Sequence, residues 1–125
     1  MRIYVAGPYS PKNHGRSNGS PNLCIREAQR NVDRAISIGL SLIRKGHFPF
    51  IPHLTHYVHQ HHEADFREDI CYEWDNTFLD NWAEALFYIS SSFGADKELE
   101  RARKLGLKIF KDLDEVPINN ELKLL

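Results

Sequence analysis

Short apolar segments alternate with longer segments of helical periodicity along this chain, and that alternation is the strongest constraint on its fold. Runs typical of buried strands occupy residues 2–6, 47–51, 85–89 and 107–110. Between them, apolar residues recur at helical spacing over about 25–45, 65–82 and 95–105. Strands that alternate with helices form parallel sheets with right-handed crossover connections.

Length and composition indicate one domain. The chain has 125 residues, of which 42% are hydrophobic and 26% are charged, as in an ordinary soluble globular protein with one core. We therefore predict that residues 1–125 form a single α/β domain. The expected architecture is a Rossmann-like or flavodoxin-like three-layer sandwich with a parallel sheet of four or five strands. Gly46 and Gly106 follow the last periodic residues of two helices and are predicted to end them.

The charge balance and the cysteines limit the class of protein. A net charge of −1 argues against a general nucleic-acid or membrane-surface binder, since neither polyanion would be attracted. No apolar run approaches the length of a transmembrane helix, and no signal peptide is evident. Cys24 and Cys71 form no disulfide framework, so we expect reduced thiols and a cytoplasmic location.

Two segments are predicted to be long loops. Residues 9–22 are polar and rich in turn formers, which is typical of a lid or a mobile insert. Residues 53–64 contain five histidines, whose spacing matches no structural zinc pattern. We expect no metal and no organic cofactor. His53 is the histidine to note, because it follows Pro52 at the end of a strand and is placed to line a pocket.

Residues 90–102 combine a turn rich in serine with the start of a helix. Ala95, Leu99 and Ala102 fall at i, i+4 and i+7, which defines an inward face, and Glu98 lies on or beside it. We place Glu98 in the first turn, where the helix N-terminus stabilises a carboxylate. Two interpretations follow: Glu98 is a nucleophile or base, or it is a favourable first-turn acid and nothing more.

Asp75 interrupts an apolar stripe on the preceding helix. Cys71, Phe78 and Trp82 lie at i−4, i+3 and i+7 from it. A carboxyl group in such surroundings must be hydrogen-bonded or shifted in pKa. The alternative is that Asp75 lies at the edge of the stripe and is solvated.

The predicted topology brings these features to one edge. In parallel α/β sheets, ligands bind outside the carboxyl ends of the strands. Gly7-Pro8, the segment after Pro52 and the Ser90–Gly94 turn all follow strands, so all are expected at that edge. Four aromatic side chains are candidates for a wall on which a nucleobase stacks, with core positions as the alternative: Phe48, Phe50, Tyr57 and Trp74.

Three segments carry a family resemblance. They are Tyr4-Val5-Ala6-Gly7-Pro8, Tyr72-Glu73-Trp74-Asp75, and Gly94-Ala95-Asp96-Lys97-Glu98-Leu99 followed by Ala102. In order and spacing they resemble the motifs of the nucleoside 2-deoxyribosyltransferase family. This family also includes hydrolases that cleave the N-glycosidic bond of nucleoside 5′-monophosphates.

The resemblance implies roles for individual residues. Glu98 would be the nucleophile that attacks the anomeric carbon, Tyr4 would orient its carboxylate, and Asp75 would exchange a proton with the base. Cleavage with retention needs such a carboxylate together with a proton donor. The remaining residues expected to bind substrate are Gly7, Pro8, His53, Trp74, Ser92, Gly94 and Asn119.

The choice between reactions rests on Ser92. Transferases of this family often carry an acidic residue there, whereas a serine before a helix suits a 5′-phosphate. We expect base exchange between a nucleoside and a free nucleobase, with monophosphate hydrolysis as the alternative. A nucleotide-binding sensor without turnover and a metal-dependent hydrolase remain further alternatives. The family often builds its sites between subunits, so we expect a homo-oligomer in which Asn119 or its neighbours approach another subunit's pocket.

Overall fold

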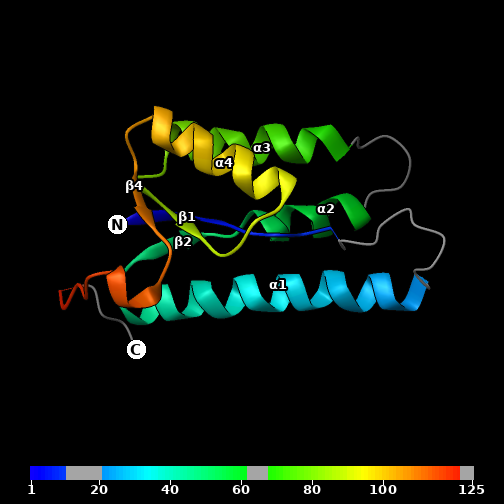
Figure 1. The fold of residues 1–125 in the computed structure, drawn as a ribbon, viewed down its shortest axis with the longest axis horizontal. Helices are drawn as coiled ribbons and strands as arrows, with labels where there is room; N and C mark the ends of the chain where they lie inside the picture. The colour runs from blue at the N-terminus through cyan, green and yellow to red at the C-terminus, as the bar shows by residue number, and fades with distance from the viewer. Residues whose placement is uncertain (11–20, 62–67, 122–125) are drawn as a thin grey trace.

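The computed structural model describes residues 1–10, 21–61 and 68–121, and in them four parallel strands form a sheet between helices (Figure 1). The elements, with η for a 3₁₀ helix, are β1 (Arg2–Ala6), α1 (Pro21–Arg44), β2 (Phe48–Phe50), η1 (Pro52–Leu54), α2 (Thr55–His61), α3 (Glu68–Asn81), β3 (Ala85–Tyr88), α4 (Phe93–Lys104), β4 (Lys108–Phe110) and η2 (Leu113–Glu115). The predicted α/β class and parallel sheet are confirmed.

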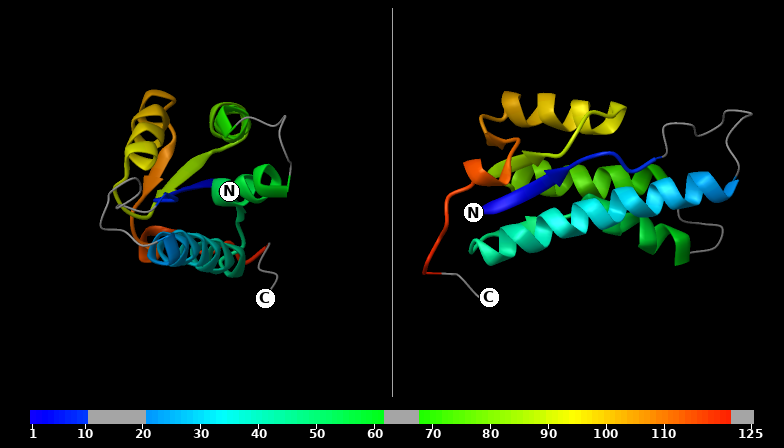
Figure 2. Two further views of the ribbon diagram at one scale, coloured as in Figure 1. Left: turned by 90° about the vertical axis from the view of Figure 1, so that its right-hand side faces the viewer. Right: turned by 60° about the horizontal axis from the view of Figure 1, so that its bottom comes forward.

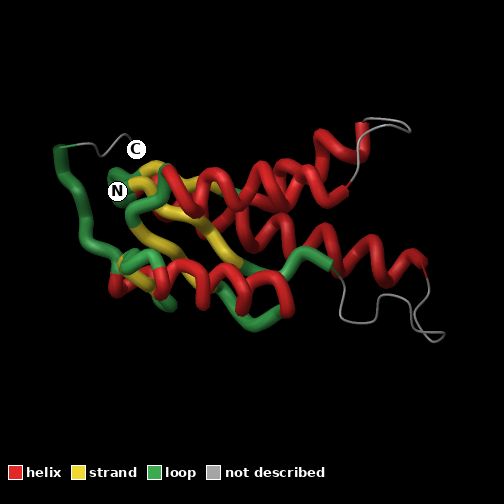
Figure 3. Tube along the Cα trace, turned by 90° about the horizontal axis from the view of Figure 1, so that it is seen from above, coloured by secondary structure: helices red, strands yellow, loops and turns green. Residues whose placement is uncertain are grey.

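The strand order defines where a ligand site is expected. The sheet runs β2-β1-β3-β4, with Tyr4 paired to Phe50 on one side and to Leu86 on the other. The chain therefore leaves β1 toward β2 and then returns to the other side of β1 as β3. The carboxyl ends of β1 and β3 flank this reversal, which is the usual ligand position in open α/β sheets. Figure 3 shows the loops that follow the strands at the same end of the sheet, with helices extending beyond them.

Alternating side chains give the sheet two cores. Ile3 and Val5 point to the face covered by α1, where they pack with Ala35, Leu42 and Phe87. Tyr4 and Ala6 point to the opposite face and pack with Leu79, Leu86, Ala95, Leu99 and Ala102. Figures 1 and 2 show α1 on one side of the sheet and α3 with α4 on the other. Tyr4 is thus a fully buried residue that points toward the helices carrying Asp75 and Glu98.

Glycines end two helices as predicted. Gly46 follows α1 with φ +90°, and Gly106 follows α4 with φ +74°. These left-handed conformations favour glycine and allow the chain to leave the helix for the next strand. At Gly46 the neighbouring tail also leaves no room for a side chain, because a Cβ would lie 2.3 Å from the carbonyl oxygen of Asn119.

The prediction of a loop over 53–64 is wrong for the residues that the structure describes. Residues 52–61 instead form η1 and α2. Apart from Pro52, their buried positions are held by His53, Thr55 and His56, at 2%, 4% and 6% exposure, rather than by aliphatic residues. Because polar residues hold these inward positions, the segment lacks the hydrophobic periodicity from which a helix is predicted. Most of the predicted lid, residues 11–20, and residues 62–64 lie outside the described part of the chain.

Among the described helices, none is long and apolar enough to cross a membrane.

Candidate active site

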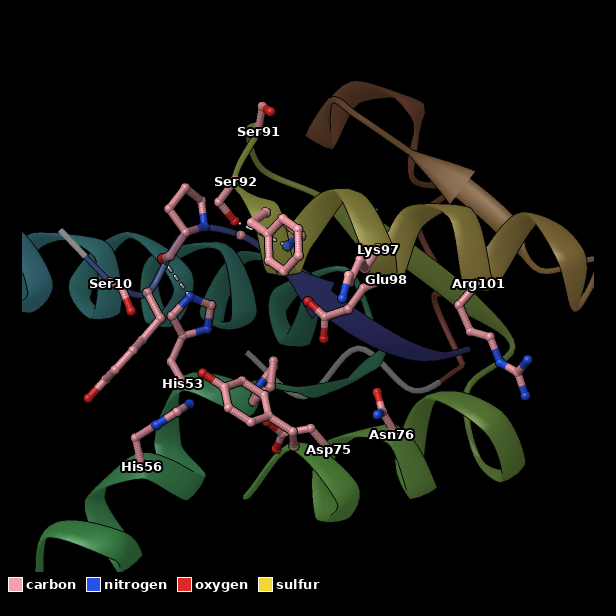
Figure 4. A pocket seen from close by; sticks show the side chains of 18 of the residues that line it. Ser10, His53, His56, Asp75, Asn76, Ser91, Ser92, Lys97, Glu98 and Arg101 are labelled. Carbon is pink, nitrogen blue, oxygen red and sulfur yellow. Dashed lines mark hydrogen bonds between the residues drawn. The ribbon is translucent and has the colours of Figure 1, made fainter. Parts of the chain in front are cut away.

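A cleft of about 1050 Å³ opens at the carboxyl ends of β1 and β3 (Figure 4). Its walls come from the segments after these strands, from η1 and α2, and from facing sides of α3 and α4. The lining includes the predicted site residues Gly7, Pro8, His53, Asp75, Ser92, Gly94 and Glu98. Residues far apart in the sequence therefore meet in one cavity, as the strand topology predicted.

Glu98 lines this cleft, and the predicted site residue Tyr4 does not, because it is fully buried in the sheet next to Glu98. The hydroxyl of Tyr4 donates a hydrogen bond to Oε2 of Glu98, which is partly buried, and thereby links β1 to α4. The helix begins at Phe93, so Glu98 lies in its second turn, and the acid of the first turn is Asp96. Our first-turn placement of Glu98 is therefore wrong, because the helix starts two residues before the expected Ala95.

The environment of Glu98 favours its neutral form more than the sequence suggested. Burial raises the pKa of Glu98 to about 7, the hydrogen bond from Tyr4 opposes that rise, and the charge of Asp75 adds to it. The helix dipole acts mainly within the first turn and is weak at this position. Burial, followed by the negative charge of Glu98, holds the pKa of Tyr4 well above its usual value. Tyr4 therefore stays a hydrogen-bond donor throughout the physiological pH range.

Asp75 is buried, as its place in the apolar stripe suggested. It is 4% exposed, and its Oδ1 lies 2.9 Å from the hydroxyl of Thr55 on α2. Burial raises the pKa of Asp75 to about 7, although the hydrogen bond with Thr55 opposes the rise. The cleft thus holds two electrostatically coupled carboxyl groups that titrate near neutrality. One ionised and one protonated carboxyl is the combination that nucleophilic attack with acid assistance requires.

The aromatic wall differs from the one we expected. Tyr9 stacks on His56 with ring centroids 4.0 Å apart, and His56 meets Tyr72 edge-on at 5.7 Å. All three side chains line the cleft. Trp74 is 38% exposed and, like Phe48, Phe50 and Tyr57, is not among the lining residues. On α3 the ring that reaches the cleft is Tyr72, one turn before Asn76, rather than Trp74 beside Asp75.

His53 lies against the loop after β1. Its Nε2 is 2.9 Å from the carbonyl oxygen of Pro8. A carbonyl can only accept, so Nε2 carries the hydrogen and Nδ1 is an acceptor in the neutral ring. Nδ1 is buried without a hydrogen-bond partner among the described residues. Burial lowers the pKa of His53, which favours this neutral form.

The start of α4 lines another part of the cleft. Ser92 caps the helix by accepting from the backbone N–H of Ala95. A Cβ added at Gly94 would meet no atom within 4 Å, so the backbone there faces open space. The Lys97 ammonium lies 4.2 Å from the ring centroid of Phe93, which is 80% exposed. Serine, glycine and lysine around a helix start are suited to an anion.

Arg101 and Asp80 join α4 to α3 beside the cleft. The Arg101 Nε and a terminal nitrogen contact the two Asp80 carboxylate oxygens at 2.9 and 3.2 Å. Sequence reasoning missed this pair and also Lys97. A signal was present, because Gly94, Glu98 and Arg101 lie at i, i+4 and i+7 on one helix face. The sequence carries no comparable signal for Tyr9, Thr55 and His56, because their places at the site depend on how η1 and α2 pack.

Asn119 lies away from this cleft. Its backbone N–H donates to the carbonyl of Lys45, at the turn that leads into β2. That turn lies at the amino end of the strands, opposite the cleft. Within the described residues, no group of three or more His, Cys, Asp or Glu side chains is placed to hold a metal ion.

Comparison with protein-family models, with curated proteins and with solved structures gave no match for this chain.

Proposed function

We propose that this protein cleaves the N-glycosidic bond of 2-deoxyribonucleosides and transfers the sugar to a second nucleobase. The observation that carries the proposal is that Glu98, which the buried Tyr4 holds by a hydrogen bond, and the buried Asp75 line one cleft. The resemblance of the three motifs to the nucleoside 2-deoxyribosyltransferase family supports the same chemistry.

In the first step the Glu98 carboxylate attacks the anomeric carbon, and the bond from that carbon to the base nitrogen breaks. The electron pair of this bond leaves with the base, and Asp75 donates its proton to the base. A glycosyl ester on Glu98 results. In the second step a nitrogen of the incoming base attacks the same anomeric carbon, and the bond from that carbon to the Glu98 oxygen breaks. The electron pair of this bond returns to the Glu98 carboxylate, and Asp75 accepts a proton from the incoming base. Two inversions at one carbon give overall retention.

Tyr4 aligns the nucleophile in this scheme. Its hydroxyl donates a hydrogen bond to Oε2 of Glu98, so Oε1 is the oxygen that attacks the anomeric carbon. Because the phenol holds its proton, it donates to the ester as well as to the carboxylate. An oriented carboxylate loses less entropy in reaching the transition state.

Base exchange requires that a free base bind in the cleft before water hydrolyses the glycosyl ester on Glu98. The Tyr9–His56 stack and Tyr72 offer aromatic surface for a base in the same cleft. A bound base also excludes water from the ester. This aromatic lining is the reason to place transfer ahead of hydrolysis.

Hydrolysis of 2-deoxynucleoside 5′-monophosphates is the second candidate. It is favoured by Ser92, Gly94 and Lys97 at the start of α4, where a phosphate would find hydroxyl, amide and ammonium donors. In that case water rather than a base resolves the glycosyl ester, and the products are free base and deoxyribose 5-phosphate.

A role for Asn119 requires a second copy of the chain. Because this residue lies at the amino end of the strands, we propose that it serves a neighbouring subunit's cleft in a homo-oligomer. Light scattering tests this directly: a fully active monomer would exclude it.

The deciding experiment is a product analysis. A deoxynucleoside is incubated with excess free base, and the matching monophosphate is incubated alone, each with and without a chelator. An exchanged nucleoside in the first reaction, unaffected by the chelator, supports base exchange. Free base and sugar phosphate in the second reaction alone support the hydrolase. Binding without turnover in both supports a sensor, and activity lost with the chelator supports a metal-dependent hydrolase.

A further inference from the structure

Thr55 has one hydroxyl hydrogen and two acceptors within reach. Its Oγ1 lies 2.8 Å from the carbonyl oxygen of Pro52 and 2.9 Å from Oδ1 of Asp75, and all three residues are buried. A hydroxyl donates once, and the Pro52 carbonyl can only accept. The Thr55 hydroxyl therefore donates either to Pro52 or to Asp75 at any one time. Which of the two it chooses depends on whether Oδ1 of Asp75 carries a proton.

Two arrangements satisfy these atoms. If Asp75 carries its proton on Oδ1, that proton is donated to Oγ1 of Thr55, and the Thr55 hydroxyl donates to Pro52. If Oδ1 is bare, the Thr55 hydroxyl turns and donates to it. Pro52 is not left unpaired, because its oxygen also accepts the backbone N–H of Thr55. Only a hydrogen moves between the two states.

From this geometry we infer that Thr55 is a positioning residue that sets which oxygen of Asp75 carries the transferable proton. When the hydroxyl donates to Oδ1, a proton on Asp75 must reside on Oδ2, the oxygen left for substrate in the cleft. When that proton passes to the leaving base, the same hydroxyl bond stabilises the carboxylate that remains. This inference rests on the proposed function for its catalytic meaning and on the contacts alone for the hydrogen bonding.

Reversible base exchange requires that Asp75 be stable both with and without its proton. Asp75 is deprotonated by the leaving base and reprotonated by the incoming one, so it passes through both states in each turnover. The Thr55 hydroxyl accepts from the acid, but it donates more strongly to the carboxylate, so its net effect is to hold the pKa of Asp75 lower. The charge of Asp75 also acts on Glu98 from α4 and on Tyr4 from β1, and His53 and His56 line the same cleft from η1 and α2.

The test compares three variants. Thr55→Val removes the hydroxyl with little change in shape, and Thr55→Ser keeps it. Thr77→Val is the matched control, because the Thr77 hydroxyl also donates to a backbone carbonyl, that of Glu73 at 2.9 Å, but is exposed and outside the cleft. If Thr55→Val does not fold, Thr55→Ala removes the same hydroxyl without placing a methyl group against Pro52.

The first readout needs no catalysis. The carboxyl carbon of Asp75 is titrated by NMR in a Glu98→Gln background, so that the coupled carboxyl at position 98 does not titrate. Removing the Thr55 hydroxyl takes a donor from the carboxylate, and the pKa of Asp75 should rise by about one unit. Thr55→Ser should restore it, and Thr77→Val should not change it. An unchanged pKa in the Thr55→Val protein overturns the inference, even if the protein has no glycosidic activity.

The second readout is kinetic and uses Glu98 intact. Thr55→Val should lower kcat about tenfold with little change in KM, a part of the ~10²–10⁴-fold that acid catalysis contributes. The alkaline limb of the pH profile should move to higher pH, because Asp75 keeps its proton longer. A loss of equal size on a substrate whose leaving group needs no proton would assign Thr55 a purely structural role.

Discussion

The Tyr4 hydroxyl on the central strand donates a hydrogen bond to Oε2 of Glu98 on helix α4, 94 positions away in the sequence. Tyr4 is fully buried and packs against Phe50, with ring centroids 5.6 Å apart. The sheet therefore fixes the phenol, and the phenol fixes the carboxylate. A nucleophile that is held in this way from a rigid element is better aligned than one held only by its own helix.

Replacing Tyr4 by Phe keeps the ring and removes that donor. The pKa of Glu98 should rise further, because the hydrogen bond from Tyr4 favours its ionised form. Glu98 must be ionised to attack, so the acid limb of kcat/KM should move to higher pH. We expect a rate loss of roughly 10–100-fold that is larger at pH 6 than at pH 8. A uniform loss across the pH range would contradict this assignment.

Asp75→Asn tests the acid. Asparagine keeps the shape and can still bond to Thr55, but it cannot donate a proton to a leaving base. Cleavage of natural bases should slow by ~10²–10⁴-fold. A substrate whose leaving group departs without protonation should react at nearly the normal rate, and similar losses on both would indicate a structural role for Asp75.

The placement of Glu98 and Asp75 was predictable because each interrupts an apolar stripe at a fixed helical offset. Burial of Leu99 and Cys71 on the same faces then carries the carboxyl groups inward. The aromatic wall was not predictable. It depends on how η1 and α2 pack, and His53 and His56 hold inward positions that hydrophobic periodicity does not reveal.

The raised carboxyl pKa values also predict how stability changes with pH. The pKa of Asp75 is raised from 3.8 to about 7 in the folded protein, so the native state binds a proton that the unfolded chain releases between about pH 4 and pH 7. Its contribution to stability falls as pH rises through that window, by roughly 2–4 kcal/mol. Asp75→Asn should therefore gain stability relative to wild type between pH 5 and pH 8 in urea denaturation. A pH-independent difference would mean that Asp75 is not perturbed.

The start of α4 discriminates between the two candidate reactions. Ser92→Ala removes the helix cap together with the hydroxyl that would donate a hydrogen bond to a phosphate, and it should cost ~0.5–2 kcal/mol of stability. Ser92→Gly also lacks the hydroxyl but costs only a few tenths of a kcal/mol as a cap. If the protein is a monophosphate hydrolase, Ser92→Gly should weaken monophosphate binding by about 1–3 kcal/mol and leave nucleoside binding unchanged. Equal effects on both ligands would argue against a phosphate at Ser92.

Gly94→Ala provides a steric test at the same place. The added Cβ meets no protein atom within 4 Å, so the fold should be retained and the helix slightly favoured. The methyl group would stand in the cleft that Gly94 lines. A several-fold rise in KM with unchanged thermal stability is expected, and an unchanged KM would place the substrate elsewhere.

The account depends most on a covalent bond between sugar and Glu98. The protein is mixed with a deoxynucleoside or its monophosphate, quenched in acid during turnover, digested and analysed by mass spectrometry. We predict a deoxyribosyl or phosphodeoxyribosyl group on the peptide that contains Glu98, and its loss together with turnover in Glu98→Gln. Turnover by Glu98→Gln at a near-normal rate, or a sugar bound to a different residue, would contradict the central claim.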